Sequence, residues 1–148
     1  MTTGAWCYYN NDPANGPIYG KLYNWYAVND PRGLVPIGWH MPSSAEWNTV
    51  VDFLGGQAVA GIKMKTTTGW SLVPGFVSTN SSGFTGLPGG SRANEGTFYS
   101  IVANAYWWSS TSCFTDIAWM NYIGNNFDES YVSLRYKTNG LSVRCVKD

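Results

Sequence analysis

The stretch Ala105–Asp148 reads AYWWSSTSCFTDIAWMNYIGNNFDESYVSLRYKTNGLSVRCVKD and decides the fold. Aromatic and β-branched residues are enriched in strands, so Trp107–Thr111 and Ala118–Ile123 predict two strands that pair with each other. We expect the two ends of the stretch to be rigid scaffold that carries the residues between them.

A second strand pair is expected at the end of the same stretch. Tyr131–Tyr136 alternates between apolar and polar residues, and Lys137–Gly140 ends in an Asn-Gly pair, which favours a tight turn. Leu141–Lys147 then alternates again, with three apolar side chains on one side. The sequence therefore predicts a C-terminal β-hairpin.

The middle of the stretch, about residues 112–138, is rich in Tyr, Asn, Ser, Phe and Asp. Tyr supplies stiff, amphipathic contact area at low entropy cost, and Ser and Asn supply adaptable hydrogen bonds. Catalysis would need a nucleophile, a general base or a metal cluster, and the segment contains no such grouping. We therefore predict a contact surface with no enzyme activity, no cofactor and no metal.

Composition narrows the class of protein. A chain of 148 residues corresponds to one domain that buries roughly two-thirds of its unfolded surface. The formal net charge is zero and charged residues make up only 12%, which argues against a nucleic-acid-binding face. The aromatic share of 16% argues against disorder. No apolar run approaches the ~20 residues of a membrane span.

The first residues, MTTGAWCYYN, contain neither a basic start nor an apolar run, so we expect no signal peptide there. Export by another route, assembly into a larger particle, or excision from a longer chain each fit this observation. The sequence alone leaves these explanations open.

Three cysteines leave an odd count. Cys7 and Cys145 would meet if the two ends of the chain paired in one sheet, so a disulfide and two buried free thiols are both open. Cys113 is expected to be a free thiol in a loop. No cysteine pair has the two-to-four-residue ligand spacing typical of a zinc site.

One helix is well marked. Ser43 and Glu46 form a capping box, apolar residues follow at helical spacing, and Gly55-Gly56 ends the helix. A weaker pattern predicts a second short helix near Lys21–Asn29, and Gln57–Met64 is expected to hold a third short turn. Lys65–Asn104 is expected to be mostly a long loop, which is typically either functional or held by packing.

Several motifs now resemble a known family. Gly38–Trp47 (GWHMPSSAEW), Leu87–Arg92 (LPGGSR) and Gly140–Asp148 (GLSVRCVKD) resemble segments of the formylglycine-generating-enzyme branch of the C-type lectin fold. The resemblance to the Fibrobacter-type major paralogous domain family is closer. The additional segments that carry it are Trp6–Asn10, Tyr19–Trp25, Trp107–Thr111 and Ala118-Trp119.

This resemblance covers nearly the whole chain and implies a single α+β domain, residues 1–148, of C-type lectin-like fold. It implies short antiparallel strands, one or two clear helices and much loop. Relatives of this kind occur among phage and bacterial proteins diversified by retroelements, in which Asn codons of a template are miscopied. The implied location is extracellular, on a bacterial surface or a virion, with a protein or glycan ligand on a cell surface. Oligomeric state and ligand identity stay open.

Miscopied Asn codons readily give Asn, Tyr, Ser, Asp, Phe, Ile, Gly, Thr, Val, Leu and Cys. These residue types dominate residues 112–138. Trp119, Glu129 and Lys137 are not such types and are expected to be scaffold. The expected ligand-binding residues are Ser112, Cys113, Phe114, Asp116, Tyr122, Gly124, Asn125, Asn126, Phe127, Asp128, Ser130, Tyr131, Ser133 and Tyr136.

Alternative functions remain beside this one. A formylglycine-generating-type oxidase needs a neighbouring cysteine pair, but Cys113 and Cys145 are far apart in sequence. A calcium-dependent lectin would carry Glu-Pro-Asn or Gln-Pro-Asp followed by Trp-Asn-Asp, and the chain has neither motif. A calcium-independent glycan-binding domain or a structural surface or virion protein of fixed specificity is the remaining alternative.

Other candidates for function have a structural explanation. His40, the only histidine, is expected to be a packing residue rather than a general base. Gly89-Gly90-Ser91 is expected to be a tight turn and not a phosphate cradle, because no Lys-Ser or Lys-Thr follows it. Most tryptophans are expected in the core, including Trp25, Trp39, Trp47, Trp107 and Trp119.

Overall fold

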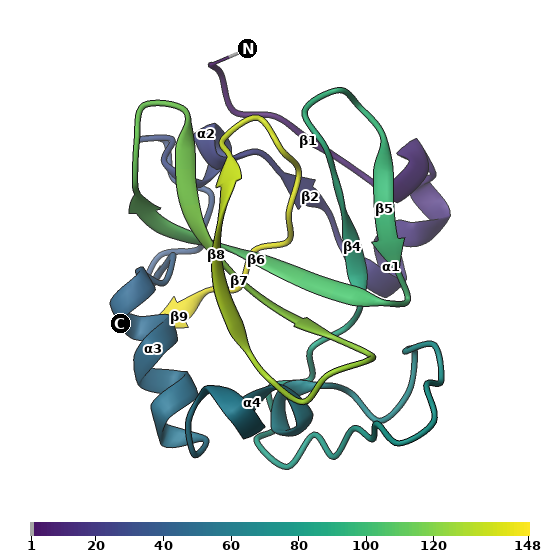
Figure 1. Cartoon of the computed structure of the whole chain (residues 1–148). Helices are drawn as coiled ribbons and strands as arrows, with labels where there is room; N and C mark the ends of the chain where they lie inside the picture. Colours follow the sequence, from purple (N-terminus) through teal and green to yellow (C-terminus); the bar gives the residue numbers. More distant parts are fainter. Residues whose placement is uncertain (1) are drawn as a thin grey trace.

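The computed structural model describes residues 2–148 and shows an α+β domain around a curled, mixed five-stranded sheet (Figure 1). The strand order is β5-β4-β6-β7-β8, and only the β4–β6 contact is parallel. The strands are β4 (Gly89–Arg92), β5 (Phe98–Ile101), β6 (Asn104–Ser112), β7 (Ile117–Gly124) and β8 (Tyr131–Tyr136).

The predicted pairing of the two Trp-containing strands is confirmed. β6 and β7 are antiparallel neighbours, with Trp108 opposite Met120, and both strands are longer than the sequence pattern indicated. The register shifts between Trp108 and Ser112, which marks a bulge near the end of β6.

The predicted C-terminal hairpin is wrong. β8 is a strand, but its partner is β7, and the residues after the turn pair with other segments instead of β8. Leu141 is fully buried and exchanges two backbone hydrogen bonds with Tyr23, at 2.7 and 3.0 Å. The last strand, β9 (Val146–Lys147), pairs with β3 (Trp39–His40) beside α3 (Figure 1). Burial of Leu141 therefore overrides the local turn signal.

The helices follow their sequence signals. Ser43 caps α3 (Ser44–Phe53), and the capping box with Glu46 is present, as predicted. A glycine pair then leads directly into α4 (Gln57–Met64). The Lys21–Asn29 pattern yields only a single-turn helix, α2 (Trp25–Val28), after strand β2 (Leu22–Tyr23). The remaining elements are β1 (Trp6–Cys7), two 3₁₀ turns (Tyr9–Asn11 and Pro13–Asn15) and α1 (Gly16–Tyr19).

The prediction that residues 65–104 form one long loop is wrong in its second half. Residues 65–88 are irregular, but β4 and β5 pair as a hairpin and join the sheet. Gly90 permits this arrangement because its φ is 66° and a Cβ there would approach the Tyr99 carbonyl oxygen to 2.5 Å.

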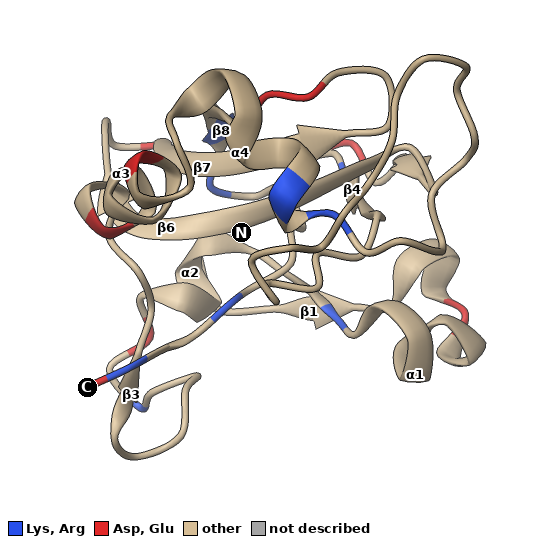
Figure 2. Ribbon diagram, turned by 90° about the horizontal axis from the view of Figure 1, so that it is seen from below, with Lys and Arg blue, Asp and Glu red and all other residues tan. Residues whose placement is uncertain are grey.

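The sheet has a core on each face. Helices α3 and α4 cover one face, while α2 and β1 lie on the other (Figure 2). The α3–α4 core includes Trp47, Met64, Trp107 and Ile123. The opposite core is built around Trp108 with Trp25, Met41, Met120 and Leu141. The lysines, arginines and acidic residues are scattered over many elements (Figure 2).

Three of the five tryptophans expected in the core are buried, namely Trp25, Trp47 and Trp107. Trp39 is 42% exposed, which contradicts the prediction, because the short β3–β9 pair lies outside both cores. Trp119 is half-buried and belongs to neither core.

All three cysteines are free. The ends of the chain do not share a sheet, since β1 pairs with β2 whereas β9 pairs with β3. Cys7 and Cys145 are therefore half-buried thiols, and burial raises the pKa of each. Among residues 2–148, no helix has both the length and the apolar character needed to span a bilayer.

We expect Trp108→Ala to lower the free energy of unfolding by about 3–5 kcal/mol, because it empties a fully buried site. Trp39→Ala should change it by about 0.5 kcal/mol or less, because that side chain lies at the surface. Urea denaturation followed by circular dichroism measures both. Equal losses in the two variants would contradict the assignment of the core.

Candidate functional site

The structure separates the expected ligand-binding residues into two groups at opposite ends of β7. Ser112, Cys113, Phe114 and Asp116 lie at the β6–β7 turn, where Tyr136 is opposite Ile117. The other end holds Tyr122, Gly124, Asn125, Asn126, Phe127, Asp128, Ser130 and Tyr131, with Ser133 between the groups. An eight-residue strand spans about 25 Å, so the fourteen residues do not form one patch.

The second group contains a row of stacked tyrosines. The register places Tyr106 of β6, Tyr122 of β7 and Tyr131 of β8 side by side on one sheet face. The ring of Tyr122 stacks on Tyr106 at 5.7 Å and on Tyr131 at 5.4 Å between centroids. Phe127 from the β7–β8 loop meets Tyr122 and Tyr131 edge to face. Cross-strand aromatic pairs of this kind hold one another in place.

Two further side chains contact Tyr106. Arg135 lies over Tyr106, with its guanidinium carbon 5.9 Å from the ring centre. The Asn104 amide donates a 2.9 Å hydrogen bond to the Tyr106 hydroxyl. We call Tyr106, Tyr122, Phe127, Tyr131 and Arg135 the tyrosine face.

Sequence reasoning missed Tyr106 and Arg135. Tyr106 lies in a strand expected to be scaffold, and Arg135 is not among the residues expected to bind the ligand. The alternation of strand side chains could have pointed to Arg135, because Tyr131, Ser133 and Arg135 of β8 share one side. Only the register with β7 and β6 brings that side to Tyr106.

The tyrosine face is partly open to solvent. Tyr122, Phe127, Tyr131 and Arg135 are half-buried, whereas Tyr106 is buried beneath them. The pKa of the Tyr131 phenol is raised, first by desolvation and then by the neighbouring Glu129 carboxylate. The Tyr131 phenol therefore stays neutral at physiological pH and remains a hydrogen-bonding aromatic surface.

A buried lysine fixes the loop that carries Phe127. Lys65 is 1% exposed, and its ammonium donates to the carbonyl oxygens of Gly124 and Phe127 at 2.9 and 2.8 Å. Burial lowers the pKa of Lys65. The loop also contacts α4, where Ile62 donates its backbone N–H to the Asp128 carbonyl at 3.1 Å. Phe127, an expected contact residue, therefore lies on a loop whose backbone is held by Lys65 and by α4.

Two expected contact residues are buried and serve the scaffold instead. Ser130 is 1% exposed and its hydroxyl donates to the Asn121 side chain at 2.9 Å. Gly124 is buried, and a Cβ there would collide with the Phe127 ring. Asn125 is half-buried and donates to the Ser71 carbonyl oxygen at 3.0 Å. Asn126 is exposed and Asp128 is half-buried.

The group at the other end of β7 is more exposed and less organised. Phe114 and Tyr136 are 63% and 51% exposed, and neither belongs to an aromatic pair among the described residues. Ser112 and Asp116 are exposed and Cys113 is half-buried. Lys137 is buried and donates to the Ser112 hydroxyl and the Phe114 carbonyl, at 2.7 and 2.9 Å, so it is scaffold.

His40 is placed as a clamp. Its Nδ1 lies 2.7 Å from Asp148 Oδ1, and its Nε2 lies 2.6 Å from Glu46 Oε1. Hydrogen bonds to both carboxylates raise the pKa of His40. Glu46 accepts hydrogen bonds from the Ser43 backbone and from His40, which lower its pKa to about 2. Both ring nitrogens are occupied, so the imidazole ties β3 to α3 and to Asp148.

We also inspected the described residues for a phosphate cradle and for a cluster of metal ligands. Gly89 and Gly90 form the start of β4, which is buried within the sheet, and do not form the predicted turn. Within residues 2–148, no three His, Cys, Asp or Glu side chains come together as metal ligands.

The model of one family, described as the Fibrobacter succinogenes major domain, matches residues 1–147. No curated protein and no solved structure matches the chain.

The His40 clamp predicts a pH window for stability. His40 has a raised pKa in the folded state. Its contribution to the free energy of unfolding is therefore complete below its ordinary pKa of 6.5 and is lost as the pH rises through the raised pKa. Glu46 has a lowered pKa, so its contribution is complete above 4.5 and is lost as the pH falls towards about 2. The melting-temperature advantage over His40→Gln should therefore be greatest between about pH 4.5 and 6.5. An advantage that keeps growing above pH 8 would refute the clamp.

Proposed function

We propose that the chain, which belongs to the Fibrobacter succinogenes major domain family, is a non-enzymatic ligand-binding domain whose binding surface is the tyrosine face. The observation that carries the proposal is the unbroken contact among four aromatic rings from two strands, a loop and the edge strand. A protein or glycan on a cell surface is the proposed ligand, and the extracellular location is part of the proposal.

The tyrosine face suits recognition for a physical reason. Its rings already hold one another, so a ligand that lies on Tyr122 and Tyr131 immobilises few side chains. Ser133 and Arg135 lie in the same row of β8 and supply polar contacts beside the rings. Aromatic residues in such settings dominate binding energetics, while polar neighbours tune selectivity.

A non-enzymatic role is supported by the chemistry of the described residues. The only histidine is engaged on both ring nitrogens, and the thiols of Cys7 and Cys145 have raised pKa values, which disfavour the reactive thiolate. Cys113 lies at the β6–β7 turn, and it is therefore not placed next to Cys145 along any strand pair.

We extend the proposal to a C-type lectin-like fold and to diversification by a retroelement. The curled sheet, the few helices and the long irregular segments are compatible with that fold. Diversification needs accessible positions on a scaffold that tolerates change. Asn126 lies on the loop held by Lys65, and Tyr122 and Tyr131 lie on the paired strands β7 and β8.

Sequencing this gene across its source population tests diversification. We expect nonsynonymous substitutions to concentrate at Tyr122, Asn126, Phe127, Tyr131 and Ser133, whose side chains are exposed or half-buried. Codons of the buried residues nearby should stay constant because change there disrupts the scaffold. Even variation along the gene, with no template copy beside it, would make this a glycan-binding or structural protein of fixed specificity.

Tyr131→Ala should abolish binding of the fluorescently labelled domain, either to a glycan array or to intact bacteria from the source community. The cost in unfolding free energy should be only about 1–2 kcal/mol, because two aromatic contacts are lost at the sheet edge. Tyr99→Ala is the matched control, since Tyr99 is an exposed tyrosine of β5 outside the tyrosine face. Equal binding by both variants would place the ligand elsewhere.

A further inference from the structure

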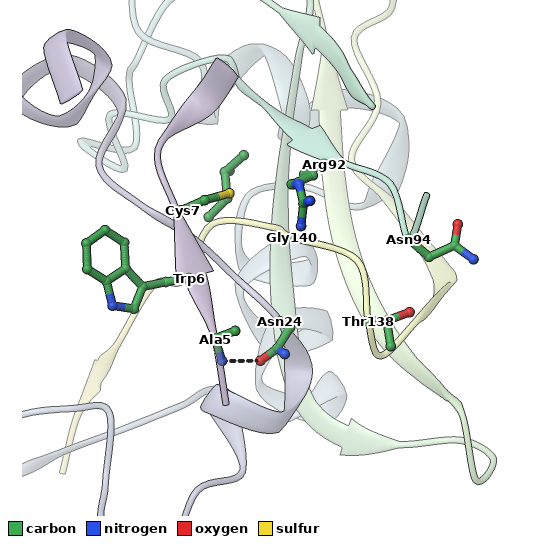
Figure 3. A pocket seen from close by; sticks show the side chains of 9 residues that line it. Ala5, Trp6, Cys7, Asn24, Arg92, Asn94, Thr138 and Gly140 are labelled. Atoms are coloured by element: carbon green, nitrogen blue, oxygen red, sulfur yellow. Dashed lines mark hydrogen bonds between the residues drawn. The ribbon is translucent and has the colours of Figure 1, made fainter. Parts of the chain in front are cut away.

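A hollow of about 410 Å³ lies between the N-terminal segment, β4 and the chain that follows β8, away from the tyrosine face (Figure 3). Its wall includes Cys7 of β1, Leu22 of β2 and Arg92 of β4, and Asn94 and Thr138 lie at one end of it. Three segments distant in sequence therefore meet around one basic side chain.

The backbone of Arg92 is fixed. Its N–H donates to the Gly140 carbonyl at 2.9 Å, and its carbonyl accepts from the Gly140 N–H at 2.8 Å. Figure 3 shows the guanidinium between Cys7 and Gly140, inside the hollow. The backbone from which this side chain extends is therefore fixed.

The guanidinium of Arg92 has no anionic partner among residues 2–148. Its Nε is buried and makes no hydrogen bond, and its one aromatic contact is Phe98, 5.8 Å from the guanidinium carbon. Arg32, by contrast, is paired with Asp30 at 2.6 Å. A buried donor without an acceptor costs free energy, and an acceptor that enters the hollow recovers it.

The surroundings of Arg92 favour an anion. No Asp or Glu lines the hollow, and Glu95 in the adjacent turn accepts a hydrogen bond from the Tyr99 hydroxyl. A guanidinium matches a planar carboxylate because two parallel N–H groups donate to its two oxygens.

Two polar side chains remain free to orient such a ligand. The Asn94 amide and the Thr138 hydroxyl make no side-chain hydrogen bond within the described part of the chain. Asn24, on the opposite wall, is occupied by the backbones of Thr3, Ala5 and Ala27 and serves as rigid structure. The apolar Leu22 closes the inner side of the hollow.

We propose that this hollow binds a small carboxylate-bearing ligand, with the carboxylate on the Arg92 guanidinium and the polar groups of the ligand near Asn94 and Thr138. The shared chemistry is a carboxylate, which a peptide C-terminus or a sugar acid can supply. This site is independent of the tyrosine face, so its failure leaves the proposed function untouched.

The test is a titration of the ¹⁵N-labelled domain, followed by the backbone amides and the arginine Nε–Hε signals. The probes are N-acetylglycine for a peptide C-terminus, glucuronate for a sugar acid, and neutral N-acetylglycinamide as the control. We expect saturable shifts at Arg92, Asn94 and Thr138 with at least one carboxylate and none with the amide. The carboxylate that binds identifies the source of the ligand.

Arg92→Gln should weaken binding roughly ten-fold or more, because the charged, bidentate donor is lost. Arg32→Gln is the matched control and should bind as the native chain does, since Arg32 pairs with Asp30 outside the hollow. If Arg92→Gln does not fold, the Asn94→Ala, Thr138→Val double variant replaces it, with a smaller loss expected. The proposal fails if neither carboxylate shifts Arg92 saturably, or if the amide shifts it equally.

Discussion

The structure depends on β6 being buried on both faces. Consecutive side chains of a strand point to opposite sides, so Trp107 enters the core under α3 and α4 while Trp108 enters the other core. Two buried indole N–H groups donate to distant carbonyl oxygens: that of Trp108 to Tyr23 at 2.7 Å, and that of Trp25 to Ser109 at 2.9 Å. Because these bonds connect β6 to distant segments, one strand joins the N-terminal region, the helices and the rest of the sheet.

Two buried lysines hold the loops at the two ends of β7. Lys65 donates to carbonyl oxygens of the β7–β8 loop, and Lys137 donates to the β6–β7 turn while its ammonium lies 4.4 Å from the ring centre of Trp25. A buried ammonium must satisfy its donors, so each lysine gathers carbonyls that would otherwise face water. The segment rich in Tyr, Asn and Ser is therefore held at both ends, which lets surface side chains differ without loosening the backbone.

The two proposed binding regions use different physics. The tyrosine face offers half-buried rings that hold one another, and its selectivity depends on shape and on polar neighbours such as Ser133 and Arg135. The hollow around Arg92 offers one unpaired cation on a fixed strand. The two regions are apart in the sheet, because β4 and β8 are separated by two strands.

The sequence by itself determined the elements with strong local signals. The Ser43–Glu46 capping box fixed α3, the Trp-rich alternation fixed the β6–β7 pair, and the family motifs followed from residue identity. Tertiary structure alone decided the partner of β8, the β4–β5 hairpin, and the stacking of Tyr106 on Tyr122. It also decided that Ser130 is buried and that Arg92 and Thr138 line one hollow. Local patterns act through residues a few positions apart, whereas strand register and burial depend on contacts between residues far apart in the chain, which no local pattern encodes.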